Sequence, residues 1–266
     1  MKNKKNKFMK IAIIGTGNIG GAVAKGLLKD HFAAQNLIIV DLNLSVLEEF
    51  KSLNNSLNTT TDAVWATSQA DMVILAVKPW LVDTLLSQIQ SSLTKDKIFV
   101  CIAAGVDFSM IKKHVNNGMP IFRVMPNTAM VIGESMTLIS SEDATKDQEN
   151  FVVELFNKLG KAVIIPEKMM GAATSVASCG IAYALRYLRA ATEGAVELGF
   201  RADEAQQIVA QTMKGAAELI LKNPESHAEV EIDKVCTPGG WTIKGLNEME
   251  ANGFSNAVIK GLKANN

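Results

Sequence analysis

The chain of 266 residues has few of the residues that build disulfide frameworks or metal centres: three cysteines and three histidines. Cys101, Cys179 and Cys236 are dispersed and show no CxxC spacing. The pattern therefore predicts reduced thiols in a cytoplasmic protein, rather than a disulfide framework or a zinc site. The histidines are equally scattered along the sequence, so we expect no metal centre.

An excess of charge of one sign and long apolar runs are also lacking. The 27 basic residues are balanced by 27 acidic ones, which gives no bulk attraction to nucleic acid or to an anionic membrane. Apolar runs such as Met72–Val77 are far shorter than the ~20 residues of a membrane-spanning helix. The lysines at 2, 4, 5, 7 and 10 are interpreted as a solvated N-terminal extension, not as a secretory signal. We therefore expect small-molecule ligands, with neither nucleic acid nor membrane as a partner.

The first 165 residues alternate short β-branched runs with helical patterns. Strands are predicted over 11–14, 37–41, 72–77, 97–102, 121–125 and 161–165. Ser45 followed by Glu48 predicts a capping box for the helix after the second strand. Near-continuous apolar strands separated by helices indicate a parallel sheet covered on both faces. The fold class is therefore α/β, a doubly wound and mostly parallel sheet of Rossmann type.

From residue 166 onward the strand patterns stop and helical spacing takes over. We expect a dinucleotide-binding domain over 1–165 and an all-α dimerisation and substrate domain over 166–266. The helices are rich in alanine, glycine and methionine and are too few to bury their apolar faces by themselves. Since large exposed apolar patches are rare on soluble monomers, the chain should form a homo-oligomer, at least a dimer.

One glycine-rich motif, Gly15-Thr16-Gly17-Asn18-Ile19-Gly20, follows a predicted strand and opens a predicted helix. The first glycine permits a tight turn, the second lets the backbone approach a pyrophosphate, and the third packs helix on strand. Asp41 ends the next predicted strand, where it would accept hydrogen bonds from the adenosine ribose. A purely structural glycine turn does not explain Asp41, so the motif predicts a dinucleotide site.

Asp41 also bears on which cofactor is used. Its carboxylate would repel the 2′-phosphate of NADPH, and no arginine lies within residues 42–49 to attract that phosphate. Glu48 and Glu49 add negative charge. The sequence therefore predicts NAD(P)H as cofactor with NADH favoured. The other interpretation is an aspartate that only ends a strand.

Further candidate cofactor contacts follow three other predicted strands, at the sheet edge where ligands of open α/β sheets bind. They are Val77, Lys78, Pro79, Ala103, Ala104, Gly105 and Asn127. Lys78 is either a cofactor contact or a solvated surface lysine. Asn127 either orients the nicotinamide amide or caps a turn.

A second motif lies in the helical half, at Cys236–Leu246. Gly239 and Gly240 follow a proline and precede a predicted helix, so backbone N–H groups point outward, which suits a small carboxylate. The Thr242 hydroxyl can hydrogen-bond an imine nitrogen, and because it is a poor acid its predicted role is orientation. A threonine that only caps the helix is equally compatible with the spacing. Together the two motifs predict a reductase of a small acid.

Five segments of the chain are typical of one family: residues 13–20, 76–79, 103–105, 123–128 and 235–246. Over nearly its whole length the chain resembles the pyrroline-5-carboxylate reductases. The resemblance implies hydride transfer from NAD(P)H to the C=N carbon of 1-pyrroline-5-carboxylate, which gives L-proline in the last step of proline biosynthesis. It also implies that the loop with Gly239 and Gly240 holds the substrate carboxylate, that Thr242 contacts the ring nitrogen, and that Thr237 and Glu167 lie near the substrate.

Two departures from the family pattern leave alternatives open. Residues 177–183 lack a serine and a proline that the family commonly has there, and Trp241 stands where a small residue or a threonine is common. Trp241 is predicted to narrow the substrate pocket, to cover the substrate ring, or to pack in the subunit interface. The alternatives are a reductase of a related cyclic imine or small oxo-acid, and a dinucleotide-binding sensor without turnover.

Overall fold

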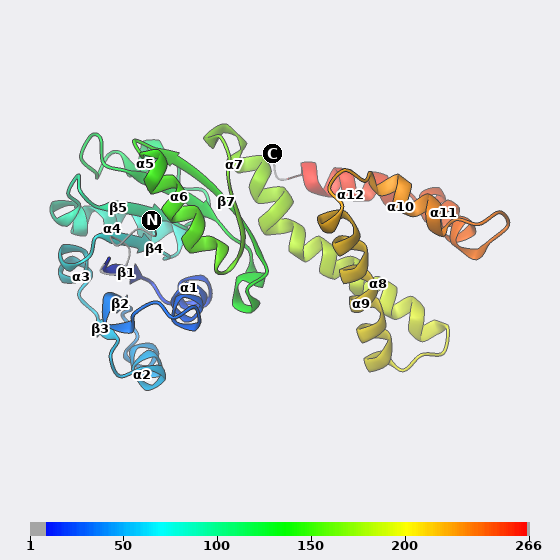
Figure 1. The fold of residues 1–266 in the computed structure, drawn as a ribbon, viewed down its shortest axis with the longest axis horizontal. Helices are drawn as coiled ribbons and strands as arrows, with labels where there is room; N and C mark the ends of the chain where they lie inside the picture. The colour runs from blue at the N-terminus through cyan, green and yellow to red at the C-terminus, as the bar shows by residue number, and fades with distance from the viewer. Residues whose placement is uncertain (1–8, 265–266) are drawn as a thin grey trace. The chain divides into compact units, whose positions relative to one another are not determined.

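The computed structural model describes residues 9–264, which form two compact units that divide between Ser178 and Cys179 (Figure 1). We call them the nucleotide unit and the helical unit and describe each by itself. The lysines at 2, 4, 5 and 7, predicted to belong to a solvated extension, lie outside the described residues.

The nucleotide unit is built on one eight-stranded sheet with the order β3-β2-β1-β4-β5-β6-β7-β8. Only the β6–β7 pairing is antiparallel, and the others are parallel. The strands are β1 Ile11–Ile14, β2 Leu37–Val40, β3 Asn58–Thr60, β4 Met72–Leu75, β5 Ile98–Cys101, β6 Ile121–Met125, β7 Ser135–Glu142 and β8 Gly160–Ile164. The predicted doubly wound, mostly parallel fold is confirmed.

The sequence did not predict two of the strands, β3 and β7. β3 is a short polar edge strand, Asn-Thr-Thr, which gives no apolar run to detect. β7 mixes apolar residues with hydroxyl residues, and Ser135, Thr137 and Ser140 are buried in it. Buried serines and threonines satisfy their hydroxyls by hydrogen bonds, as Ser135 and Thr137 do with one another at 3.0 Å.

Helices cover both faces of the sheet because strand residues alternate between the two sides. Ile11 and Ile13 belong to one core, which α1, α2 and α6 cover. Ala12 and Ile14 belong to the other, which α3, α4 and α5 cover. These helices are α1 Asn18–Lys29, α2 Leu44–Leu53, α3 Ala63–Gln69, α4 Val82–Ile89, α5 Phe108–Ile111 and α6 Lys146–Asn157. Short 3-10 helices occupy Ala34–Asn36, Pro79–Leu81 (η3), Gln90–Ser92, Thr128–Ile132 (η5) and Glu167–Met169 (η6).

The predicted capping box at Ser45 and Glu48 is wrong. Helix α2 begins at Leu44, and its N-cap is Asn43, whose side-chain oxygen accepts a hydrogen bond from the backbone N–H of Ser45 at 3.1 Å. An asparagine at the N-cap position serves as well as a serine, so the sequence offered two caps two residues apart.

The boundary between the two units falls after Ser178, later than the boundary predicted between residues 165 and 166. The segment between them forms η6, α7 Met170–Ala173 and most of a π-helix, Thr174–Cys179 (η7). Met170 and Ser175 are buried, and the Ala177 carbonyl accepts a hydrogen bond from the Asn127 side chain at 3.2 Å. These contacts hold the segment on the nucleotide unit, although its sequence has helical spacing.

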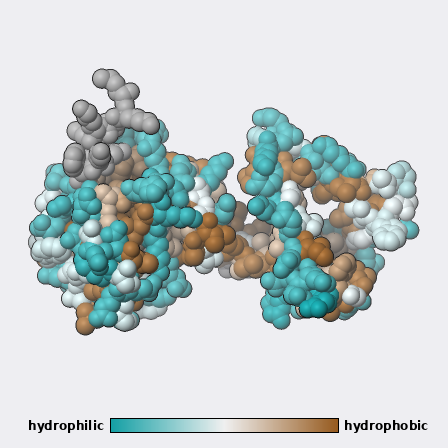
Figure 2. Space-filling model, turned by 60° about the horizontal axis from the view of Figure 1, so that its bottom comes forward, coloured by the Kyte–Doolittle hydropathy of each residue, from teal (hydrophilic) through white to brown (hydrophobic). Residues whose placement is uncertain are grey.

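The helical unit exposes most of its apolar side chains. It comprises α8 Gly180–Glu197, α9 Ala202–Lys222, α10 Ala228–Val235, α11 Trp241–Ala251 and α12 Phe254–Lys263. Tyr187 of α8 packs edge-to-face on Phe254 of α12 with ring centroids 6.2 Å apart. Among the unit's described residues, only Ala205 is buried. Figure 2 shows the resulting hydrophobic surface on this unit.

None of the helices in residues 9–264 combines the length and the apolar composition that crossing a membrane requires.

Candidate dinucleotide and substrate sites

The glycine-rich turn has the backbone geometry that its sequence predicts. Gly15 has φ +87°, a region that favours glycine. A Cβ on Gly20 would lie 1.9 Å from the carbonyl oxygen of Gly15, so only glycine lets α1 pack this closely. A Cβ on Gly17 would meet no atom within 4 Å, which leaves open space beside the backbone for a ligand.

The N-terminus of α1 has the features of an anion-binding helix end. Gly17 is its N-cap, and within the described chain no side chain caps the helix and no acidic residue occupies its first turn. Asn18 is exposed and Ile19 packs partly against the core. The first backbone N–H groups of the helix are therefore available, as a pyrophosphate requires.

Asp41 follows β2 and is bound to the glycine-rich turn. Its Oδ2 accepts hydrogen bonds from the backbone N–H of Thr16 at 2.9 Å and from the Thr16 hydroxyl at 3.0 Å. Its Oδ1 accepts from the backbone N–H of Asn43 at 3.0 Å. Burial by itself raises the pKa of Asp41, but these hydrogen bonds outweigh it and hold the pKa below its ordinary value. The carboxylate is thus charged at neutral pH and held beside the turn.

The strand order brings the other cofactor candidates to the same edge. Strand β1 lies between β2 and β4, so the chain leaves neighbouring strands in opposite directions here, and dinucleotides bind at such a switch point. Val77, Lys78 and Pro79 follow β4; Lys78 is exposed and Pro79 begins η3. Ala103, Ala104 and Gly105 follow β5; Ala103 is buried and the other two are exposed.

Asn127 follows β6 and caps η5. Its side-chain oxygen accepts from the backbone N–H of Ala129 at 3.0 Å, and its side-chain nitrogen donates to the Ala177 carbonyl at 3.2 Å. Its backbone N–H donates to the hydroxyl of Ser135 at 3.1 Å. Of the two roles considered for Asn127, the structure shows the cap.

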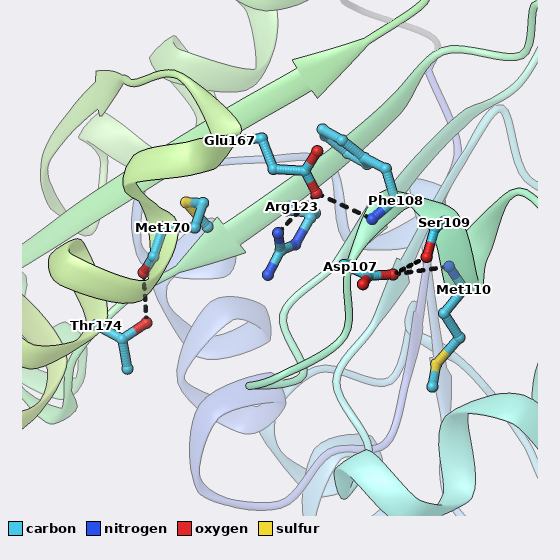
Figure 3. Close-up of polar contacts among 8 residues, drawn as sticks. All are labelled: Asp107, Phe108, Ser109, Met110, Arg123, Glu167, Met170 and Thr174. Carbon is cyan, nitrogen blue, oxygen red and sulfur yellow. Dashed lines mark hydrogen bonds and ion pairs between the residues drawn. The ribbon is translucent and has the colours of Figure 1, made fainter. Parts of the chain in front are cut away.

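Glu167, expected near the substrate, has its carboxylate in an ion pair (Figure 3). Oε1 accepts hydrogen bonds from Nη1 of Arg123 at 2.8 Å and from the backbone N–H of Phe108 at 3.0 Å. The sequence predicted no role for Arg123. The available signal was a single charge inside the apolar strand Ile-Phe-Arg-Val-Met, but spacing alone cannot identify a partner 44 residues away.

In the helical unit, the second motif forms a glycine-rich loop at the start of α11, the candidate anion cradle. Gly239 has φ +71°, and Gly240 is the N-cap, with no side-chain cap and no acidic residue in the first turn. The Gly240 N–H donates to the carbonyl of Thr237 at 2.9 Å. A Cβ on Gly240 would lie 2.4 Å from the Thr237 hydroxyl oxygen, so the glycine makes room for that side chain.

Thr242 is the second residue of α11, not its cap. Trp241 and Thr242 are both exposed, Trp241 to 92%. Among the residues that the structure describes, none hydrogen-bonds the Thr242 hydroxyl, and the N-cap position belongs to Gly240. The hydroxyl beside the cradle is therefore available to a ligand.

A cavity of about 680 Å³ lies where the end of α1 meets the end of α2, and it is lined by Lys25, Leu28, Lys29, His31, Phe32, Leu53 and Asn54. It contains none of the candidate residues of the sheet edge or of the glycine-rich loops. Among residues 9–264, no three His, Cys, Asp or Glu side chains come together as a metal site.

A glycine-rich turn opening α1 at the switch point, with a charged aspartate beside it, defines a dinucleotide-binding protein of the Rossmann class, here joined to an all-helical unit that carries the candidate cradle. The chain is 40% identical to Pyrroline-5-carboxylate reductase 1 and 37% identical to Pyrroline-5-carboxylate reductase 2, both of Dictyostelium discoideum, over 95% and 98% of its length. The chain belongs to the pyrroline-5-carboxylate reductase family.

These matches differ in how much of each relative they cover. The chain spans 48% of the first relative's length and 91% of the second's. A solved pyrroline carboxylate reductase of Plasmodium falciparum, with NADP bound, is 26% identical and superposes with a TM-score of 0.86, covering 97% of this chain and 95% of that one. The fold of both units is thus the fold of the family.

Two family models match separate parts of the chain. Residues 10–105 match the model described as NADP oxidoreductase coenzyme F420-dependent, and residues 167–266 match pyrroline-5-carboxylate reductase dimerisation. The first match covers the glycine-rich turn, Asp41 and the segments after β4 and β5. The second covers the cradle and all helices of the helical unit. The chain therefore carries an NAD(P)H-binding part and a dimerisation part.

Proposed function

We propose that the chain reduces 1-pyrroline-5-carboxylate to L-proline by hydride transfer from NADH or NADPH, the reaction for which its family is named. The carrying observation is that one chain holds both a dinucleotide turn with open space at Gly17 and a glycine-rich cradle followed by the free hydroxyl of Thr242. The chain is an NAD(P)H-dependent oxidoreductase of proline biosynthesis.

The residues of the glycine-rich turn fit a nicotinamide dinucleotide. The backbone at Gly17 and the first turn of α1 bind the pyrophosphate, and Asp41 accepts hydrogen bonds from the adenosine ribose. Val77, Lys78 and Pro79, with Ala103, Ala104 and Gly105, provide the surface after β4 and β5 on which the rest of the cofactor lies. When bound, the reduced nicotinamide supplies the hydride for the imine carbon.

The cradle orients the substrate. Backbone N–H groups at Gly239 and Trp241 bind the carboxylate with the help of the α11 dipole and the Thr237 hydroxyl. The Gly240 N–H is not part of this set, because it donates to the Thr237 carbonyl. Thr242 hydrogen-bonds the ring nitrogen and so fixes the orientation of the ring. Its contribution is orientation, because a threonine hydroxyl is too weak an acid to protonate the amine.

The cofactor preference that we propose is NADH. The charged carboxylate of Asp41 is held at the end of β2 by Thr16 and Asn43, where a 2′-phosphate would be repelled.

The assembly that we propose is a homodimer or a larger homo-oligomer, in which each copy covers the exposed apolar residues of the other's helical unit.

The cysteines Cys101, Cys179 and Cys236 are free thiols. Burial raises the pKa of the Cys101 thiol to about 11. Unpaired cysteines agree with a reducing compartment, and we propose the cytoplasm.

A related cyclic imine or small oxo-acid is the second candidate substrate. The exposed indole of Trp241 favours it, because a large ring beside Thr242 changes the shape of the space that the substrate enters. A dinucleotide-binding sensor is disfavoured, since the cradle that such a protein would not need is present.

The test is turnover by the purified full chain, with 1-pyrroline-5-carboxylate and NADH or NADPH. We expect one proline to form for each reduced nicotinamide consumed, and we expect Gly17→Ala to lose activity through weaker cofactor binding. A panel of other cyclic imines is measured in parallel. A much higher kcat/KM on one of these, with negligible proline formed, would refute the assignment.

A further inference from the structure

In the loop after β5, residues 102–107, Ala103 and Val106 are buried in the core and the two residues between them are exposed. Its first end is fixed by the Ile102 N–H, which donates to the Leu75 carbonyl at 2.9 Å. Ala104 and Gly105 are exposed, and a Cβ on Gly105 would meet no atom within 4 Å. The exposed pair is therefore positioned by the packing of Ala103 and Val106 and by the attachment of the far end, Asp107 and Phe108.

The far end begins α5, a helix of four residues that is too short to be stable by itself. Asp107 caps it by accepting from the backbone N–H of Met110 at 2.8 Å. That bond lies within the loop and helix and does not tie them to the sheet. The Phe108 N–H is the first of the helix's unpaired donors, and it is buried with its residue.

Glu167 satisfies that donor from another part of the chain. Its Oε1 accepts from the Phe108 N–H at 3.0 Å and, at the same time, from Arg123 of β6 at 2.8 Å. The Arg123 side chain is 12% exposed, and its guanidinium lies 5.9 Å from the Phe108 ring centroid. Figure 3 shows Glu167 between Arg123 and Phe108, so β6, α5 and η6 meet at one carboxylate oxygen.

The strand order indicates which half of the cofactor this loop serves. Asp41 at the end of β2 marks the adenosine side, and the pyrophosphate lies at the start of α1, beside β1. A dinucleotide extends across the switch point, so its nicotinamide half lies over the ends of β4, β5 and β6. The loop after β5 is therefore on the nicotinamide side.

We propose that Glu167, charge-paired with Arg123, is a positioning residue that fixes the loop of residues 102–107 against the nicotinamide half of the cofactor. It acts through the Phe108 N–H and does not contact the substrate. This inference rests on the proposed use of a nicotinamide dinucleotide and adds a role that the glycine-rich turn does not supply.

The experiment compares two ligands of the full chain by calorimetry: NADH, and ADP-ribose, which lacks the nicotinamide. Glu167→Ala should weaken NADH binding about tenfold or more, as expected for loss of a hydrogen bond to a charged group. ADP-ribose should keep its affinity, because Asp41 and the α1 N-terminus are unchanged. Glu167→Gln keeps the acceptor for Phe108 and should recover most of the NADH affinity.

The matched control is Glu142→Ala. Glu142 pairs with Lys112 and so also ties the end of α5 to the sheet, but it does not accept from the loop. We expect this variant to bind both ligands like the wild type. If Glu167→Ala does not fold, Glu167→Asp, which keeps the charge but is one methylene shorter, should show the same selective loss.

Three results would overturn the proposal: equal weakening of both ligands, no weakening of NADH in a folded variant, or an increase in the KM of pyrroline-5-carboxylate alone. The last would mean that Glu167 contacts the substrate. Because the comparison measures cofactor binding, a wild-type chain that binds NADH but makes no proline would refute the proposed function and leave this inference testable.

Discussion

At the scale of single residues, the Thr242 hydroxyl has no hydrogen-bond partner among the described residues. It is exposed in the first turn of α11, and the cap of that helix is Gly240. We therefore expect this hydroxyl to bind a ligand rather than to stabilise the fold.

Thr242→Ala should therefore lower kcat/KM for pyrroline-5-carboxylate with little change in Tm. A lost hydrogen bond to a neutral partner costs roughly 0.5–1.5 kcal/mol and one to a charged nitrogen about 1.5–3. At about 1.4 kcal/mol per factor of ten, the loss ranges from a few-fold to about a hundredfold. Steady-state kinetics and thermal unfolding measure the two quantities. Thr242→Ser, which restores the hydroxyl, is the control, and an unchanged kcat/KM in the alanine variant would contradict the assigned role.

The predicted preference for NADH depends on the carboxylate of Asp41. Asp41→Ser should raise the ratio of kcat/KM for NADPH to that for NADH by about tenfold or more, because it removes a charge that repels the 2′-phosphate. Kinetics with each cofactor give the ratio. Asp41→Asn, which keeps the size of the side chain, separates charge from shape and should shift the ratio in the same direction. A wild-type enzyme that strongly prefers NADPH would refute this prediction.

At the scale of an element, α1 depends on two glycines for different reasons. Gly20 lets the helix pack against the turn, since a Cβ there would lie 1.9 Å from the Gly15 carbonyl oxygen and 3.0 Å from the Ala76 Cβ. Gly17 has no such neighbour, so any demand for glycine at that position must come from the ligand.

The two alanine variants should therefore differ. Gly20→Ala should lower both Tm and NADH affinity, at a cost of about 1–3 kcal/mol for overpacking. Gly17→Ala should lower NADH affinity and leave Tm in place. Calorimetric titration and thermal unfolding of both variants give the comparison. Full NADH affinity in Gly17→Ala would show that the pyrophosphate does not lie against this backbone.

At the scale of the whole molecule, the helical unit exposes more apolar side chains to water than is expected of a single copy. Its exposed apolar residues include Leu185, Leu198, Ile208, Leu219 and Trp241. Monomeric proteins rarely expose contiguous apolar patches of large size, so a second copy should cover these helices.

Gly194→Arg tests the assembly. A Cβ on Gly194 would meet no atom within 4 Å of its own chain, so the new side chain should disturb only a neighbouring subunit. We expect dimer content and activity to fall together, measured by light scattering and by turnover at the same concentrations. Ser91→Arg, at an exposed position of the nucleotide unit, should change neither. A fully active monomer in the wild type would contradict the prediction.

Much of the fold could be predicted because its signals are local. Strand β1 was predicted at the observed residues, and β2, β4 and β5 within two residues of their ends, since buried parallel strands are near-continuous apolar runs. β3 and β7 were missed because a polar edge strand and a strand with buried hydroxyls lack that run. The capping box failed because Asn43 and Ser45 are competing caps two residues apart.

The candidate site, like the fold, has residues whose roles follow from the local sequence and residues whose partners do not. The roles of Gly15 and Gly20 follow from a turn and a helix that lie together in the sequence, and both are visible in the spacing. The partners of Asn127 and Glu167 could not be predicted, because Ala177 lies 50 residues from the first and Phe108 lies 59 residues from the second. Hydrogen bonds over such separations depend on which strands become neighbours.

The sequence by itself determined six of the eight strands of the sheet, the glycine-rich turn followed by Asp41, the glycine-rich loop before Thr242, and an excess of apolar helix surface. Those features depend on the backbone freedom of glycine and on hydrophobic periodicity, which act over a few residues. Only the tertiary structure decided that residues 167–178 belong to the nucleotide unit, and that Glu167 joins Arg123 to Phe108. A carboxylate binds whichever donors the packing of distant strands brings within about 3 Å, and that packing is a property of the whole sheet.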